Sequence, residues 1–249
     1  MKLFRNIRRK LLISGKIKSY LIYALGEILL IVIGILIAWK INNLNEIRKN
    51  KIVQVKIYES LYEELNTNLN VLDKTIVGYS NTILSLENTL NYVGLHPNKL
   101  TQETKDIIVH IKFKTTNLRD KSLNSVNMTD KFQFLENDSL AELIAQYPSK
   151  LKTFENQEAK INNIVESRLK PIIEKHVSLI DLFPNDNKNY KNIKLFGQKS
   201  NYIQLLNSKD YQNSVIDQLM QTQIQLNNGI NLRKKTRTLA FKLSQVLRN

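Results

Sequence analysis

The sequence contains no cysteine, which excludes disulfide bonds, thiolate metal sites and cysteine nucleophiles from all 249 residues. Glycine and proline are scarce, with seven and four residues. Because tight turns depend on these two residue types, their scarcity favours long helices over a β-sandwich. The length allows one sizeable domain, or one domain with an anchor.

Motifs that carry enzymatic chemistry are also missing. No two of the three histidines, His96, His110 and His176, have the spacing of metal ligands, and the chain has no HExxH, no glycine-rich phosphate loop and no GxSxG. Glu63 and Glu64 are adjacent, so on a helix their side chains diverge by about 100° and suit a solvated face. The sequence therefore gives no support for an enzyme, and we expect no cofactor and no metal.

The positive charge is concentrated at the N-terminal end. The first 56 residues hold twelve basic and two acidic residues, a net charge of +10, whereas the other 193 residues carry +5. A nucleic-acid-binding protein would show its basic face on the folded domain, so we expect no nucleic-acid partner. Anionic lipid headgroups attract such basic segments. We expect the basic residues Arg5, Arg8, Arg9 and Lys10 to contact these headgroups at the membrane surface.

Residues 20–41 have the properties of a transmembrane helix. From Leu21 to Trp39 the only charged residue is Glu27, and a spanning helix needs about 20 apolar residues. A cleaved signal peptide would need small residues where Trp39 and Lys40 stand. A buried helix of a soluble protein is the other alternative, and the flanking basic segments argue against it. We therefore expect the lipid bilayer as a partner.

The distribution of basic residues predicts the orientation of this helix. Seven basic residues precede the span and five follow it closely. We place the span in a bacterial inner membrane. The positive-inside rule then puts residues 1–19 in the cytoplasm and residues 42–249 in the periplasm. Residues 2–13 also alternate apolar and basic groups at helical spacing, which predicts a short amphipathic helix on the inner leaflet.

Glu27 is the unusual residue of the span. It shares a helix face with Gly34 and Ala38, whose spacing of four allows two helices to approach closely. This face is a candidate for packing in a homo-oligomer or against a membrane-protein partner, and Glu27 is a candidate proton-titrating group. The simpler interpretation, which we favour, is that Glu27 reaches the inner headgroups or pairs with a basic residue there.

The same segment resembles the opening of an uncharacterised family of single-pass membrane proteins from Bacteroidota. The resemblance rests on a basic start, the Gly26-Glu27 pair, the run Gly34 to Ala38 and the exit Asn42-Asn43-Leu44-Asn45-Glu46, where Leu44 replaces the usual aromatic residue. The stretch from Lys121 to Glu155 is more loosely similar to the middle of those chains. The resemblance implies a helical extramembrane domain and no known activity.

A heptad repeat dominates the sequence after the span. Apolar residues alternate steps of four and three for five heptads: Tyr58, Tyr62, Leu65, Leu69, Leu72, Ile76, Tyr79, Ile83, Leu86, Leu90 and Val93. The pattern predicts a helix that ends at Gly94–Pro97. Few flanking positions are charged, so we favour an antiparallel bundle within one chain over a coiled coil between chains.

Later segments predict further helices over residues 102–114, around 119–126, from Asp138 or Ser139 onward, and from Lys209 toward Val246. We expect Pro148 and Pro171 to kink or divide the second of the long helices, in which Glu158 interrupts the apolar spacing. The fold class is therefore all-α.

Three functions remain open. The leading hypothesis is a membrane-anchored module that acts through protein contacts, such as an envelope scaffold or sensor. The second is a subunit of an ion- or proton-coupled assembly that uses Glu27. The third is a membrane-tethered enzyme, for which no motif speaks.

Overall fold

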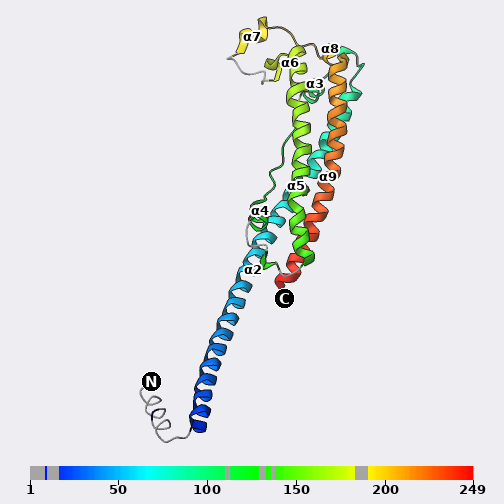
Figure 1. Ribbon diagram of the computed structural model, residues 1–249. Helices are drawn as coiled ribbons and strands as arrows, with labels where there is room; N and C mark the ends of the chain where they lie inside the picture. The colour runs from blue at the N-terminus through cyan, green and yellow to red at the C-terminus, as the bar shows by residue number, and fades with distance from the viewer. Residues whose placement is uncertain are drawn as a thin grey trace. The chain divides into compact units, whose positions relative to one another are not determined.

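A computed structural model (Figure 1) describes Arg9 and residues 17–109, 111, 113–128, 133–135, 138–182 and 190–248. Every regular element in these ranges is a helix, so the predicted all-α fold class is confirmed. The chain divides into two compact units, Met1–Lys56 and Ile57–Asn249. The helices are α2 (Ile17–Asn91), η1 (Pro97–Lys99), α3 (Gln102–Val109), α4 (Lys121–Asn127), α5 (Asp138–Ile164), η3 (Val165–Leu169), α6 (Lys170–His176), η4 (Leu179–Leu182), α7 (Lys191–Phe196), α8 (Tyr202–Asn207) and α9 (Lys209–Arg248).

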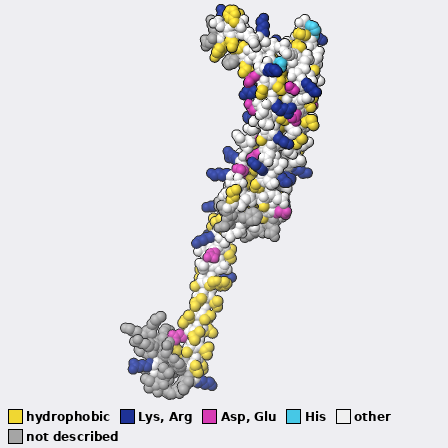
Figure 2. Space-filling view, turned by 45° about the horizontal axis from the view of Figure 1, so that its top comes forward, with side chains coloured by type: hydrophobic (Ala, Val, Ile, Leu, Met, Phe, Trp, Pro, Cys, Tyr) yellow, Lys and Arg dark blue, Asp and Glu magenta, His cyan; other side chains and the backbone are white. Residues whose placement is uncertain are grey.

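The first unit is built on the N-terminal part of α2, which is apolar on every side. An 18-residue window of this helix has a mean hydropathy of 2.7, and none of its residues is buried. Figure 2 shows its apolar side chains facing outward, and Leu30 and Trp39 are 67% and 63% exposed. Among the described residues this is the one helix long and apolar enough to cross a membrane. The amphipathic helix predicted over residues 2–13 lies outside the described residues.

In the second unit, α2 from Ile57 onward packs with α5 and α9. The Tyr147 hydroxyl meets that of Thr236 at 2.5 Å, and Gln157 donates to the Gln221 carbonyl at 3.1 Å, so α5 and α9 run antiparallel. α9 also lies antiparallel to α2, as residues 73 and 79 of α2 bond to residues 233 and 225 of α9. At Gly229 an added Cβ would lie 3.4 Å from a side-chain carbon of Ile76, because α9 approaches α2 closely there.

The heptad pattern identifies most of the buried face of α2. Its members at every seventh position are buried, namely Tyr58, Leu65, Leu72, Tyr79 and Leu86. The alternate members are half-buried, namely Tyr62, Leu69, Ile76, Ile83 and Leu90. Val93 lies beyond the helix and is 37% exposed. The buried face is wider than the apolar stripe, since polar residues beside it, among them Glu64 and Asn68, are buried as well.

The predicted end of this helix is close to the observed one. α2 ends at Asn91, and Gly94 adopts φ +81°, a conformation that favours glycine. His96 then caps the short helix η1, where its ring accepts a hydrogen bond from the Asn98 backbone.

Two predicted helix boundaries need correction. The helix expected over residues 102–114 is α3 and stops at Val109, because residues 113–120 are non-helical and bond to side chains of the long helices. Pro148 lies inside α5 without dividing it. Pro171 marks a change of helix type and no break: it is the second residue of α6, which follows the π-helical turn η3, a geometry that accommodates the missing N–H.

Candidate functional site

The residues predicted for transmembrane packing lie together on one helix. Glu27 is half-buried, whereas Gly34 and Ala38 are exposed, and an added Cβ at Gly34 would meet no atom within 4 Å. Their spacing places all three on one face of α2, and this face is exposed at Gly34 and Ala38. Of the predicted surface basic residues, Arg9 is exposed, and Arg5, Arg8 and Lys10 lie outside the described residues.

The two histidines that the structure describes belong to separate short helices. His96 caps η1, His176 ends α6, and His110 lies outside the described residues. Within the described ranges, no three Asp, Glu or His side chains are placed to hold a metal ion.

The strongest polar cluster in the second unit surrounds Glu158, which is 3% exposed. Its carboxylate accepts hydrogen bonds from the Tyr79 hydroxyl at 2.5 Å, from the Thr116 hydroxyl at 2.6 Å and from the Thr116 backbone N–H at 3.0 Å. The apparent break in the apolar spacing of α5 is therefore a buried acceptor. The carboxylate links α2, α5 and the segment 113–120, and its donors offset part of the desolvation that burial imposes.

Tyr79 is the member of this cluster on α2. Burial, and then the hydrogen bond to Glu158, raise the pKa of its hydroxyl above its ordinary value. Its ring stacks on Phe113 with 6.0 Å between the centroids and is tilted against Phe154 at 6.4 Å. Gln225 of α9 donates to the Tyr79 hydroxyl at 3.3 Å. With its proton held toward a carboxylate, Tyr79 is arranged to position neighbouring groups and not to release a proton near neutral pH.

A second set of side chains fixes the chain that follows Thr116. Asn68 forms two 2.7 Å hydrogen bonds with the backbone N–H and carbonyl of Arg119, which is the pattern of one step of a β-ladder. Glu64 accepts from the backbone N–H groups of Ser122 and Leu123, at 2.7 and 3.1 Å. These donors belong to the first turn of α4, where they have no partner within the helix.

The prediction for the two adjacent glutamates is therefore wrong for Glu64. Glu63 is exposed, as expected, but Glu64 is 6% exposed and faces α4. Its burial is stable because two backbone donors satisfy the carboxylate. A sequence signal existed, since Glu64 and Asn68 are spaced by four beside the heptad seam, but their partners lie more than fifty residues away.

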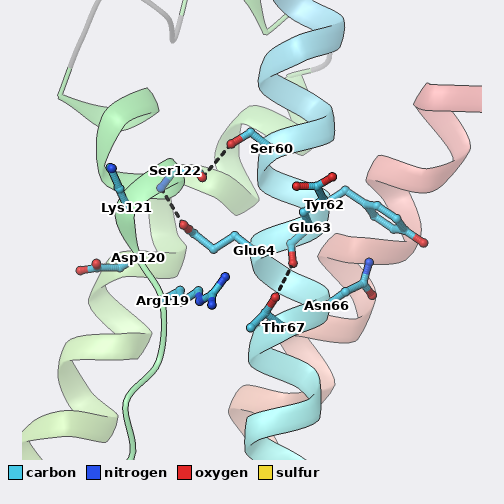
Figure 3. Close-up of a pocket in the computed structure, with 10 residues that line it drawn as sticks. All are labelled: Ser60, Tyr62, Glu63, Glu64, Asn66, Thr67, Arg119, Asp120, Lys121 and Ser122. Carbon is cyan, nitrogen blue, oxygen red and sulfur yellow. Dashed lines mark hydrogen bonds between the residues drawn. The ribbon is translucent and has the colours of Figure 1, made fainter.

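We call the hydrogen bonds of Glu64 and Asn68 to the backbone of residues 119–123 the clamp. An open pocket of about 830 Å³ lies beside it, between residues 60–67 of α2 and residues 119–122. Figure 3 shows Glu64 turned toward Ser122, whose hydroxyl meets that of Ser60 at 2.8 Å. The pocket is also lined by Glu63, Arg119, Asp120 and Lys121, so charges of both signs surround it. Because Glu64 is committed to backbone donors, the arrangement serves to hold a segment of chain in place.

Comparison with protein families, with curated proteins and with solved structures gives no match for this chain.

Proposed function

We propose that this chain is a membrane-anchored helical module that acts through contacts with another protein. The observation that carries the proposal is an exposed group of apolar residues near one end of the second unit. We call this group the apolar tip, and its members are Leu179, Tyr190, Ile193, Leu195 and Phe196.

The apolar tip is built on a segment set apart from the bundle core. The chain leaves the bundle after α6 and rejoins it before α8 at one point, where the Asn201 backbone N–H donates to the His176 carbonyl at 2.8 Å and the Ser178 N–H donates to the Ser200 hydroxyl at 2.8 Å. α7, which carries three of the five apolar residues, lies beside η4 (Figure 1). The tip therefore projects from a closed base.

The composition of the tip supports a protein partner. Phe196 and Leu195 are 84% and 61% exposed, and Lys191 and Lys199 flank them. Exposed apolar groups rimmed by polar ones mark interaction sites, because water is a poor solvent for them. A partner with apolar side chains bordered by acidic ones would complement this surface.

The topology belongs to the same proposal. We place residues 1–19 in the cytoplasm of a bacterial cell, with anionic headgroups as their partner, and residues 42–249 in the periplasm. The charge bias across the span supports this orientation. A reporter active only outside the cytoplasm, fused after Asn249, should be active, and activity of a cytoplasmic reporter at that site would contradict the orientation.

Photo-cross-linking in living cells tests the partner contact. A photoreactive residue at Ile193 or at Phe196 of the full-length chain should capture one and the same protein, and Leu195→Ser should reduce both adducts severalfold. The matched control is a photoreactive residue at Lys152, which is exposed on α5. Adducts no stronger than at Lys152, or adducts with lipid alone, would contradict the proposal.

A second candidate function rests on Glu27, an ionisable residue within the apolar span. If the chain is a subunit of a proton-coupled complex, Glu27→Gln should abolish the proton-coupled activity of that complex in the cell and leave the association of its subunits intact. In a purely structural helix contact, Gly34→Leu should disrupt cross-linking between single cysteines on the Glu27–Gly34–Ala38 face, and Glu27→Gln should preserve it. Background cross-linking in every variant would contradict the helix contact.

A further inference from the structure

A groove with basic walls runs between α5 and α9. Its main cavity has a volume of about 340 Å³, and a neighbouring cavity of about 80 Å³ shares Lys150, Asn231 and Lys235 with it. The main cavity lies within the range of about 300–1,000 Å³ that ligand sites occupy. Residues 143–150 form one wall, and residues 231–239 form the other.

Three lysines, Lys150, Lys234 and Lys235, line this groove, and none of the described residues that line it is acidic. In the described part of the chain none of the three makes an ion pair. Two other basic residues of α9 are engaged elsewhere: Arg233 pairs with Asp73 at 3.0 Å, and Lys242 donates to Ser139 at 3.0 Å. The groove therefore keeps an uncompensated positive charge.

The composition of α9 maintains this charge over a long distance. From Gln218 to Arg248 the helix has six basic residues and no acidic one. Basic residues in the last turn are favoured by the helix dipole, but Lys234 and Lys235 lie more than three turns before the end. The dipole therefore does not account for their position.

The remaining lining supplies hydrogen-bonding groups and a fixed floor. Asn231 can donate to a ligand, whereas the Thr238 hydroxyl donates to the Lys234 carbonyl at 3.0 Å and the Tyr147 hydroxyl is already held by Thr236 at 2.5 Å. Gln146 donates to Glu142, whose carboxylate is not among the lining groups. Leu143 and Leu239 add apolar surface.

We propose that this groove binds a phosphate group of a phosphate ester. Three lysines are matched by an anionic group with several acceptor oxygens, and lysine binds phosphate as a point charge. Leu143, which is half-buried, offers apolar surface to the ester's organic part. The ester comes either from a phospholipid headgroup or from a soluble phosphate compound, and this inference does not depend on the apolar tip.

Titration calorimetry on the full-length chain in zwitterionic nanodiscs tests the proposal. Glycerol phosphate represents the soluble source, and dioctanoyl phosphatidylglycerol below its micelle concentration represents the lipid source. The groove variant carries Lys150→Gln, Lys234→Gln and Lys235→Gln. The matched control carries Lys160→Gln, Lys175→Gln and Lys209→Gln, which remove the same charge from exposed positions outside the groove.

We expect the wild-type chain to bind one of the two probes, more weakly as salt rises. The groove variant should lose at least tenfold in affinity, and the control variant less than twofold. The probe that binds more tightly identifies the source. Equal losses in both variants, or binding of neither probe at low salt, would overturn the proposal. Circular dichroism and the unfolding midpoint of each variant verify that both are folded.

Discussion

Tyr79 of α2 donates a 2.5 Å hydrogen bond to Glu158 of α5, and both side chains are buried. This bond joins two helices through residues that are 79 positions apart in the chain. It also fixes which faces of the two helices meet, since a rotation of either would remove the donor from the carboxylate.

Removal of this donor should destabilise the bundle. Tyr79→Phe keeps the ring and its stacking on Phe113 but leaves Glu158 with fewer donors. We expect the free energy of unfolding to fall by about 1–3 kcal/mol, because a buried carboxylate loses part of its compensation. Chemical denaturation of the full-length chain measures the change. Tyr62→Phe, at a half-buried position, is the control and should change stability by less than about 0.5 kcal/mol.

The buried tyrosines should make the fold sensitive to alkali. Burial raises the pKa of Tyr147 to about 12, whereas an unfolded tyrosine has its ordinary value near 10. The stabilising contribution of the protonated hydroxyl is complete below pH 10 and is lost as the pH rises from 10 toward 12. The loss from this group should be on the order of 2 kcal/mol. Unfolding free energies between pH 8 and 11.5 should fall less steeply in Tyr147→Phe, and an unchanged slope would contradict this assignment.

Gln218 should be a site where a mutation stabilises the protein. Its side chain is completely buried in α9, and neither its amide nitrogen nor its amide oxygen has a hydrogen-bond partner among the described residues. Gln218→Leu replaces an unsatisfied amide by an apolar group of similar size, so stability should rise by about 1–2 kcal/mol. Gln225→Leu is the matched contrast and should lower stability, because the Gln225 amide nitrogen donates to Tyr79 and to the Phe154 carbonyl. Thermal unfolding of both variants decides between these signs.

Asn68 should control local opening of the segment before α4. Asn68→Ala removes both hydrogen bonds to the Arg119 backbone. We expect amide hydrogen exchange at Arg119 to become about tenfold faster, while the α5 and α9 cores exchange as before. Asn70→Ala, two positions away on the exposed side, should leave the exchange at Arg119 unchanged. Equal acceleration in both variants would show that the clamp is not the cause.

The sequence predicts the helices of this fold better than their polar contacts. The heptad from Tyr58 to Leu90 locates the core face of α2, because apolar spacing depends on helix geometry alone. The turn at Gly94 and the start of α9 at Lys209 are also where local signals place them. The apolar span is equally visible, since its signal lies within one continuous segment.

The buried carboxylates could not be predicted in the same way. Glu64 and Glu158 are each satisfied by donors 42 to 79 residues away, so a local pattern treats one as a solvated charge and the other as an interruption. The short extent of α3 has the same origin, because residues 113–120 bond to side chains of α2 and α5. The basic groove depends on the antiparallel alignment of Lys150 with Lys234 and Lys235, which no sequence spacing reveals.

The closed base of the segment 178–200 has a consequence for how this protein can diversify. Because His176 and Asn201 are hydrogen-bonded to each other, the two chain ends that join the segment to the bundle keep the same position whatever lies between them. A segment of different length or chemistry can be grafted at this junction without a change in the core that α6 and α8 share. Binding specificity at the tip is then free to evolve at a different pace from the stability of the bundle beneath it.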